Sequence, residues 1–181
     1  AAGAGGDRAD HGPERLGTTT SRAMATLGPM AKVGVGDPAP EFELAGAEGR
    51  AYRLSDYRGK WVILAFYPGD FTPVCTRQFC SYRDADDRLD ELGVEVLGIS
   101  PQSVDSHERF AAKHGLTVPL LADEARSAIR AYGVDAPGGL VRRSIFIIDP
   151  DGVIRYRHVA LLGLHYKDVD DLSKALATVR R

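Results

Sequence analysis

The sequence has few cysteines, no long apolar run and no excess of positive charge. Its two cysteines among 181 residues are too few for the disulfide framework of a small secreted domain. Its longest apolar run, residues 61–67, is far below the roughly 20 residues that a membrane-spanning helix needs. A formal charge of −2 provides no surplus of Lys and Arg to neutralise phosphates. We therefore expect a protein that neither crosses a membrane nor binds nucleic acid.

The remaining composition is that of one globular domain. Hydrophobic residues make up 44% of the chain, charged residues 27%, and the mean hydropathy is −0.20, values typical of a water-soluble protein. A chain of this length buries one good core but is too short for two ordinary domains. A close cysteine pair in such a domain fits a reducing compartment, and we expect the cytoplasm.

The first 32 residues differ from the rest. They are rich in Ala, Gly and Thr and have neither strand nor helix periodicity, which predicts disorder. They hold no apolar segment of signal-peptide length, and their Asp and Glu residues argue against an organellar transit peptide. We interpret residues 1–32 as a disordered leader from expression or upstream read-through, with Met24 or Met30 as the natural start, and assign the folded domain to residues 33–181.

From residue 33 onward, strand-like segments alternate with helix-like ones. Continuous apolar runs such as 61–67 and 94–100 are typical of strands buried on both faces. The alternation predicts a mainly parallel sheet covered on both faces, and two hairpins add antiparallel strands. The expected fold is α/β, a mixed central sheet flanked by helices, with an N-terminal β-hairpin. Strands are expected at 41–44, 51–54, 61–67, 94–100, 118–123 and twice within 144–160, and helices at 103–115, 124–133 and 168–179.

A further helix is expected after Cys75. Apolar residues recur there at near-helical spacing, opposite a charged, solvated face; they are Phe79, Tyr82, Leu89 and Leu92.

Both cysteines lie in one short segment, YPGDFTPVCTRQFCSYRD, which spans residues 67–84. A turn follows the strand there, and a helix is expected to begin near Val74, since the missing N–H of Pro73 costs nothing at a helix start. Cys75 then lies in the first helical turn, where unpaired N–H groups and the helix dipole stabilise an anion. We expect a resting thiolate, with the hydroxyl of Thr72 nearby to hold a small polar substrate.

This segment resembles the active-site segment of peroxiredoxins. Pro68, Thr72 and Cys75 reproduce the family's Pro-x-x-x-Thr-x-x-Cys motif, and FYPGDFTPVCT is similar to its usual setting at the end of a strand. GDPAPEFEL, VEVLGIS, VPLLAD and RRSIFIIDPDGVIRY follow in the family's order from about residue 33. The resemblance implies a thioredoxin-like fold and a thiol-dependent peroxidase that reduces hydrogen peroxide and organic hydroperoxides. It implies no cofactor, and a thioredoxin-like dithiol as the reductant.

The family's functional residues fall on particular positions of this chain. Cys75 matches the peroxidatic cysteine, Thr72 the hydroxyl that contacts the peroxide, and Pro68 the residue that shields the pocket. Arg143 matches the active-site arginine, and Gln78 the position that orients it. Thiolate attack breaks the O–O bond and leaves a sulfenic acid. We expect Arg143 and the backbone N–H of Cys75 to stabilise the charge on the departing oxygen.

Two arginines stand side by side in the segment that carries the expected active-site arginine. Adjacent residues of a strand point to opposite faces, so only one of Arg142 and Arg143 can face Cys75. We choose Arg143 and expect Arg142 to be a surface residue.

Cys80 lies five residues after Cys75 on the same expected helix. That spacing separates the two Cα atoms by about 9 Å, whereas a disulfide needs at most about 7 Å. The spacing is similar to that of the peroxiredoxin Q or bacterioferritin-comigratory subfamily, in which the second cysteine resolves the sulfenic acid within the same chain. The resemblance thus implies a resolving Cys80, and the separation of the two Cα atoms then requires the first turns of the helix to unwind. We expect a monomer or weak homodimer.

Other interpretations of the cysteine pair stay open from the sequence. Val74 stands where the subfamily often has Gly, so a one-cysteine peroxiredoxin with a non-resolving Cys80 is the first alternative. A non-enzymatic thiol redox sensor would use the same thiolate for a single oxidation. A zinc site of the two cysteines with His107 and His114 is disfavoured by loose spacing and by histidines that we interpret as residues of a solvated helix. A thioredoxin-type oxidoreductase would need C-x-x-C, which is absent.

Overall fold

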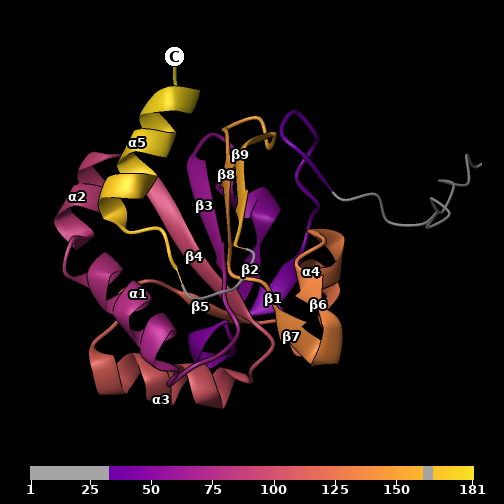
Figure 1. Ribbon diagram of the computed structural model, residues 1–181, viewed down its shortest axis with the longest axis vertical. Coiled ribbons are helices and arrows are strands. Elements are labelled where there is room, and N and C mark those ends of the chain that lie inside the picture. The colour runs from indigo at the N-terminus through magenta and orange to yellow at the C-terminus, as the bar shows by residue number, and fades with distance from the viewer. Residues whose placement is uncertain (1–32, 161–164) are drawn as a thin grey trace, which may run out of the picture.

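The computed structural model describes residues 33–160 and 165–181, and the predicted leader, residues 1–32, lies outside them. A seven-stranded sheet in the order β2-β1-β5-β4-β3-β8-β9 forms the centre, and helices cover both of its faces (Figure 1). The predicted mixed α/β architecture with an N-terminal hairpin is therefore confirmed. Among the described residues, no helix has both the length and the apolar character for a membrane span.

The elements follow the predicted order. The sheet strands are β1 (Glu43–Ala45), β2 (Ala51–Arg53), β3 (Trp61–Phe66), β4 (Val94–Ser100), β5 (Leu120–Ala122), β8 (Ser144–Ile148) and β9 (Ile154–Val159), and a separate small hairpin pairs β6 (Asp135–Ala136) with β7 (Leu140–Val141). The α-helices are α1 (Pro73–Arg83), α2 (Asp86–Glu91), α3 (Val104–His114), α4 (Ser127–Ala131) and α5 (Val169–Val179).

Parallel pairing is confined to the centre of the sheet. Strand β4 pairs in parallel with β3 and with β5, whereas β1–β2, β1–β5, β3–β8 and β8–β9 are antiparallel. The sheet is mixed as predicted, but antiparallel pairs outnumber parallel ones, so the prediction of a mainly parallel sheet is wrong. The antiparallel pairs come from the two hairpins, whose strands lie at both edges of the sheet. The arrangement brings the carboxyl ends of β3 and β4 to one edge of the molecule, where ligand sites of α/β proteins form.

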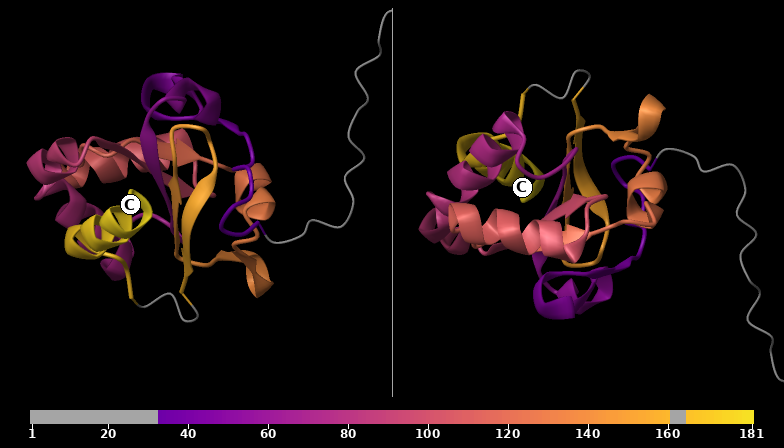
Figure 2. Two further views of the ribbon diagram at one scale, coloured as in Figure 1. Left: turned by 90° about the horizontal axis from the view of Figure 1, so that it is seen from above. Right: turned by 90° about the horizontal axis from the view of Figure 1, so that it is seen from below.

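Strand β3 is buried on both faces, as its continuous apolar sequence predicts. Alternate β3 residues enter two separate cores, one under α1, α2, α3 and α5 and one under α4 (Figure 2). Gly98 of β4 lets α1 approach closely, since a Cβ there would lie 2.9 Å from the Phe79 ring. The helix that carries both cysteines therefore packs directly on the sheet.

Two predicted helices have different bounds in the structure. The segment after Cys75 divides into α1 and α2 at Asp84 and Ala85, where Ala85 adopts φ −123° and ψ 27°. The acidic residues after the break are largely exposed, in agreement with the predicted solvated face. Helix α4 covers only residues 127–131 of the predicted 124–133, and the β6–β7 hairpin was not predicted because its strands have two residues each.

Candidate active site

The site begins where β3 ends and α1 starts. Thr72 is the N-cap of α1, and its Oγ1 accepts a hydrogen bond from the backbone N–H of Cys75 at 3.3 Å. Pro73 occupies the first helical position, so the predicted start near Val74 is correct to within one residue. The Cys75 side chain is completely buried against the helix-covered core. Pro68 lies half-buried at the beginning of the same loop.

Arg143 immediately precedes β8, the strand beside β3, and contacts Cys75 from there. Strand β8 runs antiparallel to β3 with Ser144 opposite Phe66, which brings the preceding residue to the carboxyl end of β3. The Nη2 atom of Arg143 donates to Cys75 Sγ at 3.2 Å. Arg143 is only 3% exposed, so its guanidinium acts on the sulfur with little screening by water. Arg142 is half-buried rather than on the surface, and its backbone N–H bonds to the Val134 carbonyl.

Gln78 links Arg143 to the C-terminal part of the chain. Its Oε1 accepts a hydrogen bond from Arg143 Nη1, and its Nε2 donates to the Tyr82 hydroxyl at 3.0 Å. Tyr82 in turn donates to the carbonyl of Lys167, just before α5, at 2.7 Å. Burial is the main cause that raises the pKa of Tyr82, so the phenol keeps its proton and remains a donor. Successive hydrogen bonds thus join Cys75, through Arg143 and two α1 side chains, to the start of α5.

Cys80 lies on the same uninterrupted helix as Cys75. Both cysteines are free thiols, and Cys80 is half-buried. The Cys80 carbonyl accepts from the N–H of Asp84, so helical bonding continues through it. A rise of about 1.5 Å per residue keeps the two Cα atoms about 9 Å apart, beyond the reach of a disulfide.

One expectation about the site is corrected by the structure, and another stays a prediction. The N–H of Cys75, expected to stabilise a departing oxygen, donates to Thr72 Oγ1 at a long 3.3 Å, and its role toward that oxygen stays a prediction. His107, interpreted as a residue of a solvated helix, is buried, and its Nδ1 lies 2.8 Å from Asp70 Oδ2. Among the described residues no group of three or more His, Cys, Asp and Glu side chains is arranged to hold a metal ion, so the zinc alternative lacks a ligand set there.

Sequence reasoning missed the residues beneath the active-site loop. Tyr67, Asp70 and His107 form one buried hydrogen-bonded cluster. One sequence signal could have predicted that His107 is buried: it lies three residues before Phe110, an apolar residue, and therefore on the same face of α3.

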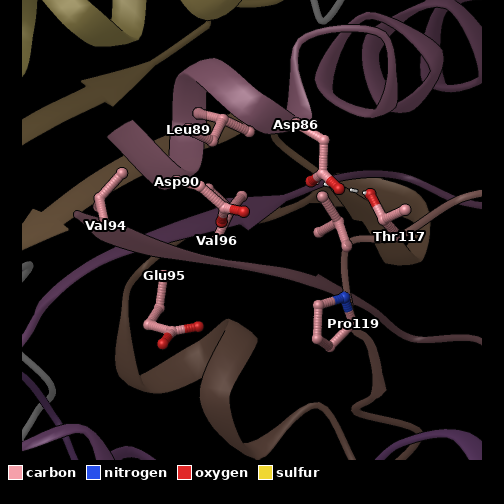
Figure 3. A pocket seen from close by; sticks show the side chains of 9 residues that line it. Asp86, Leu89, Asp90, Val94, Glu95, Val96, Thr117 and Pro119 are labelled. Carbon is pink, nitrogen blue, oxygen red and sulfur yellow. Dashed lines mark hydrogen bonds between the residues drawn. The ribbon is translucent and has the colours of Figure 1, made fainter. Parts of the chain in front are cut away.

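A surface pocket of about 290 Å³ lies away from the cysteines, between α2, β4 and the segment before β5 (Figure 3). Asp86, Asp90 and Glu95 give it an acidic lining, and the Asp86 carboxylate accepts a hydrogen bond from Thr117 at 3.1 Å. The residues that line this pocket include no cysteine, histidine, lysine or arginine.

Fold and site together define a thioredoxin-like protein with a buried cysteine at a helix N-terminus and an arginine on its sulfur. The model of the AhpC/TSA family matches residues 35–157. The chain belongs to that family, and its resemblance to peroxiredoxins is confirmed.

Individual relatives support this assignment. The chain is 39% identical over 143 residues to the chloroplastic peroxiredoxin Q of Oryza sativa subsp. japonica, covering 78% of this chain but only 64% of that protein. It is 35% identical over 157 residues to peroxiredoxin Bcp of Bacillus subtilis, covering 81% of this chain and 94% of that protein. A solved structure of the Xanthomonas campestris bacterioferritin comigratory protein is similar with a TM-score of 0.67 and 27% identity, covering 77% of this chain and 90% of that one.

Proposed function

We propose that this chain is a thiol-dependent peroxidase in which Cys75 attacks the peroxide. One observation carries the proposal: the guanidinium of the buried Arg143 donates to Cys75 Sγ at 3.2 Å, at the N-terminus of α1. A cation and a helix N-terminus both favour the thiolate over the thiol. Cys80 has no comparable hydrogen bond among the described contacts, which singles out Cys75 as the nucleophile.

In the first step, the Cys75 thiolate attacks one oxygen of the peroxide and the O–O bond breaks. The sulfur is oxidised to a sulfenic acid, and the other oxygen leaves with the electron pair and takes up a proton as water or an alcohol. Arg143 is placed to stabilise that charge. The Thr72 hydroxyl donates to the Gly69 carbonyl at a long 3.4 Å, so a peroxide oxygen can replace this weak acceptor. Pro68, half-buried at the loop, limits the access of water.

In the second step, the Cys80 thiol attacks the sulfenic sulfur and water leaves, so an intramolecular disulfide forms. This step needs the first turns of α1 to unwind, because the intact helix holds the two Cα atoms about 9 Å apart. A dithiol of the thioredoxin type then supplies two electrons and restores both thiols.

The substrates and surroundings follow from the same chemistry. Hydrogen peroxide and organic hydroperoxides are the proposed substrates, and the alkyl peroxide reduction activity named for the Xanthomonas campestris relative supports the second class. We propose a reducing compartment such as the cytoplasm, where the free cysteines persist between turnovers. A monomer or weak homodimer is proposed as the working form.

Peroxide consumption with a continuous supply of dithiothreitol or thioredoxin tests the proposal. We expect steady turnover by the wild type and none by Cys75→Ser, because a serine hydroxyl is not ionised near neutral pH. Cys80→Ser is the matched control for the reaction with the first equivalent of peroxide, since it makes the same change on the same helix and keeps the nucleophile. Retained turnover in Cys75→Ser, or a single stoichiometric oxidation of the wild type as in a redox sensor, would contradict the proposal.

A further inference from the structure

A buried acid–histidine pair lies directly beneath the loop that leads to Cys75. Asp70 follows β3, and its side chain is 0% exposed; His107 comes from α3, and its side chain is 2% exposed. The Nδ1 atom of His107 lies 2.8 Å from Asp70 Oδ2. The reaction proposed above uses neither residue.

Two hydroxyl groups complete the surroundings of the Asp70 carboxylate. Tyr67 donates to Oδ1 at 2.8 Å, and Ser106 donates to Oδ2 at 2.7 Å. Burial is the main cause that raises the pKa of Tyr67 well above its ordinary value, and the charge of Asp70 adds to it, so the phenol keeps its proton and donates. Each donor thus favours a charged carboxylate at this place.

Stability alone is a poor reason for this arrangement. Removing a carboxylate from water is costly, and well-packed apolar side chains commonly stabilise a core as well as or better than buried charged groups do. The position of the pair is more informative, because Asp70 stands between Gly69 and Thr72. Thr72 caps α1 at Cys75, and its hydroxyl donates to the Gly69 carbonyl. A shift of Asp70 would therefore move the donor and the helix start that face the peroxide.

Residues 69–71 of the loop also contact the segment that runs from the end of β4 through α3. The backbone N–H of Asp70 donates to Gln102 Oε1 at 2.5 Å, and a Cβ on Gly69 would lie 3.0 Å from the Gln102 amide. Phe71 adopts φ 59°, a strained backbone for a residue other than glycine, and its ring packs on Phe110 with centroids 5.2 Å apart. The segment from the end of β4 through α3 thus acts as a support under the whole loop.

We infer that Asp70 and His107 are positioning residues, which hold the Gly69–Thr72 loop so that Thr72 and Cys75 meet the peroxide in reactive geometry. The inference rests on the proposed peroxidase function. Neither residue touches the reacting atoms, and both act through the loop backbone. Displacement of reacting groups by about 1 Å is enough to slow a reaction about 100-fold. A loosened loop should therefore slow the peroxide reaction far more than a reaction that needs only an accessible thiolate.

Two substitutions of His107 separate positioning from general stability. Asparagine places its amide near the position of Nδ1 and keeps a donor for Asp70, whereas glutamine places it near Nε2 and does not. Cys75 is then oxidised by hydrogen peroxide in stopped flow and, separately, alkylated by iodoacetamide. We expect His107→Gln to slow the peroxide reaction about tenfold or more while alkylation is not slowed, because iodoacetamide reaches the buried Cys75 only when the loop opens. His107→Asn should restore the peroxide rate to within about threefold of the wild type.

A second variant keeps the test decisive if the His107 variants fold poorly. Ser106→Ala removes one donor from Asp70 at the edge of the cluster, and Ser103→Ala makes the same change at the N-cap of the same helix without touching Asp70. We expect only Ser106→Ala to slow the peroxide reaction, by about threefold, although Ser103→Ala removes the cap of α3 and lowers the stability of the protein.

The outcomes distinguish the inference from the function on which it rests. Equal slowing of peroxide oxidation and alkylation, or unchanged peroxide rates in both His107→Gln and Ser106→Ala, would overturn the positioning role while wild-type turnover stands. A wild type that does not react with peroxide at all would instead overturn the proposed function.

Discussion

At the scale of single residues, the position of one guanidinium distinguishes the two cysteines. Arg143 donates to the sulfur of Cys75 and is itself held by Gln78. In the proposed first step, the guanidinium stabilises both the attacking sulfur and the oxygen that departs when the O–O bond breaks. Buried charges act strongly because little water screens them.

Substitution of the two adjacent arginines tests this arrangement. We predict that Arg143→Ala slows oxidation of Cys75 by peroxide about tenfold or more, because the developing charge loses its main donor. Arg142→Ala is the matched control and should leave the rate nearly unchanged, since its side chain is not among those that contact the sulfur. Stopped-flow fluorescence measures both, and the reverse order of effects would contradict the assigned orientation of the strand.

Asp70 makes a pH-dependent contribution to stability. Burial, the largest influence, by itself raises the pKa of this carboxyl, but hydrogen bonds from His107 and Ser106 outweigh it and hold the pKa below its ordinary value of 3.8. A lowered folded-state pKa means that the stabilisation is complete above the unfolded value and is lost as the pH falls through the folded value.

Asp70→Asn should therefore lower the free energy of unfolding by about 2 kcal/mol at pH 7. The difference from the wild type should shrink below about pH 4, because protonation then removes the same charge from the wild-type protein. Urea unfolding at a series of pH values measures the difference. A gap that stays constant down to acid pH would show that the carboxylate charge is not what stabilises this cluster.

The residues of the motif segment could be predicted because they are close together in the sequence. Thr72, Pro73 and Cys75 form a local helix start whose chemistry is contained in a few consecutive residues. The cluster of Tyr67, Asp70 and His107 could not be predicted in this way. It joins the end of β3 to α3, and each member taken alone is an ordinary polar residue of a turn or helix.

At the scale of elements, the proposed mechanism requires two conflicting properties of helix α1. It must be folded to place Cys75 beside Arg143, and it must unwind for Cys80 to reach the oxidised sulfur. The hydrogen bond from Tyr82 to the Lys167 carbonyl ties the last turn of this helix to the segment before α5. Cys80 lies in the same turn, so this tie opposes its movement toward Cys75 and should limit how fast the disulfide forms.

We predict that Tyr82→Phe speeds disulfide formation after oxidation by about fivefold or more, because it removes the bond to the Lys167 carbonyl and the bond from Gln78, each worth about 1 kcal/mol, and both losses favour the opened helix. Quenched-flow alkylation of the remaining thiols measures this rate. Tyr132→Phe is the matched control: it removes a similar hydroxyl bond to the Pro40 carbonyl, in the core on the other face of the sheet. Equal acceleration in both variants would mean that global stability, rather than the tie on α1, controls the step.

Most elements could be predicted from periodicity, and the failures have local causes. β3 and β4 are continuous apolar runs, and Gly115 at φ 59° ends α3 as predicted. The break between α1 and α2 was missed because Phe79, Tyr82 and Leu89 face one core across it, so the apolar spacing continues where the helix does not.

At the scale of the whole molecule, the order of the strands assembles the site. Arg143 precedes β8, Cys75 follows β3, and the supporting histidine follows β4, and these three strands are neighbours in the sheet. The pairing of β3 with β8 could be inferred from sequence only through resemblance, because nothing local specifies which strands adjoin. The proposed two-cysteine mechanism needs this assembly intact for the first step and partly opened for the second.

Cys80→Ser separates the two halves of the cycle. We predict a nearly normal rate for the first equivalent of peroxide, because the second thiol takes no part in that step. The variant should then stop as a sulfenic acid with thioredoxin as reductant and oxidise further to the sulfinic acid more readily than the wild type. Unimpaired turnover of Cys80→Ser with thioredoxin would show that Cys80 does not resolve the intermediate.

The most direct test is the intact mass of the wild-type protein after one equivalent of hydrogen peroxide, with remaining thiols alkylated before measurement. The proposed mechanism predicts a loss of about 2 Da and no alkylation, because Cys75 and Cys80 have formed a disulfide. A stable gain of one oxygen with Cys80 alkylated would contradict the resolving role of Cys80. An unchanged protein with both cysteines alkylated would contradict the peroxidase function itself.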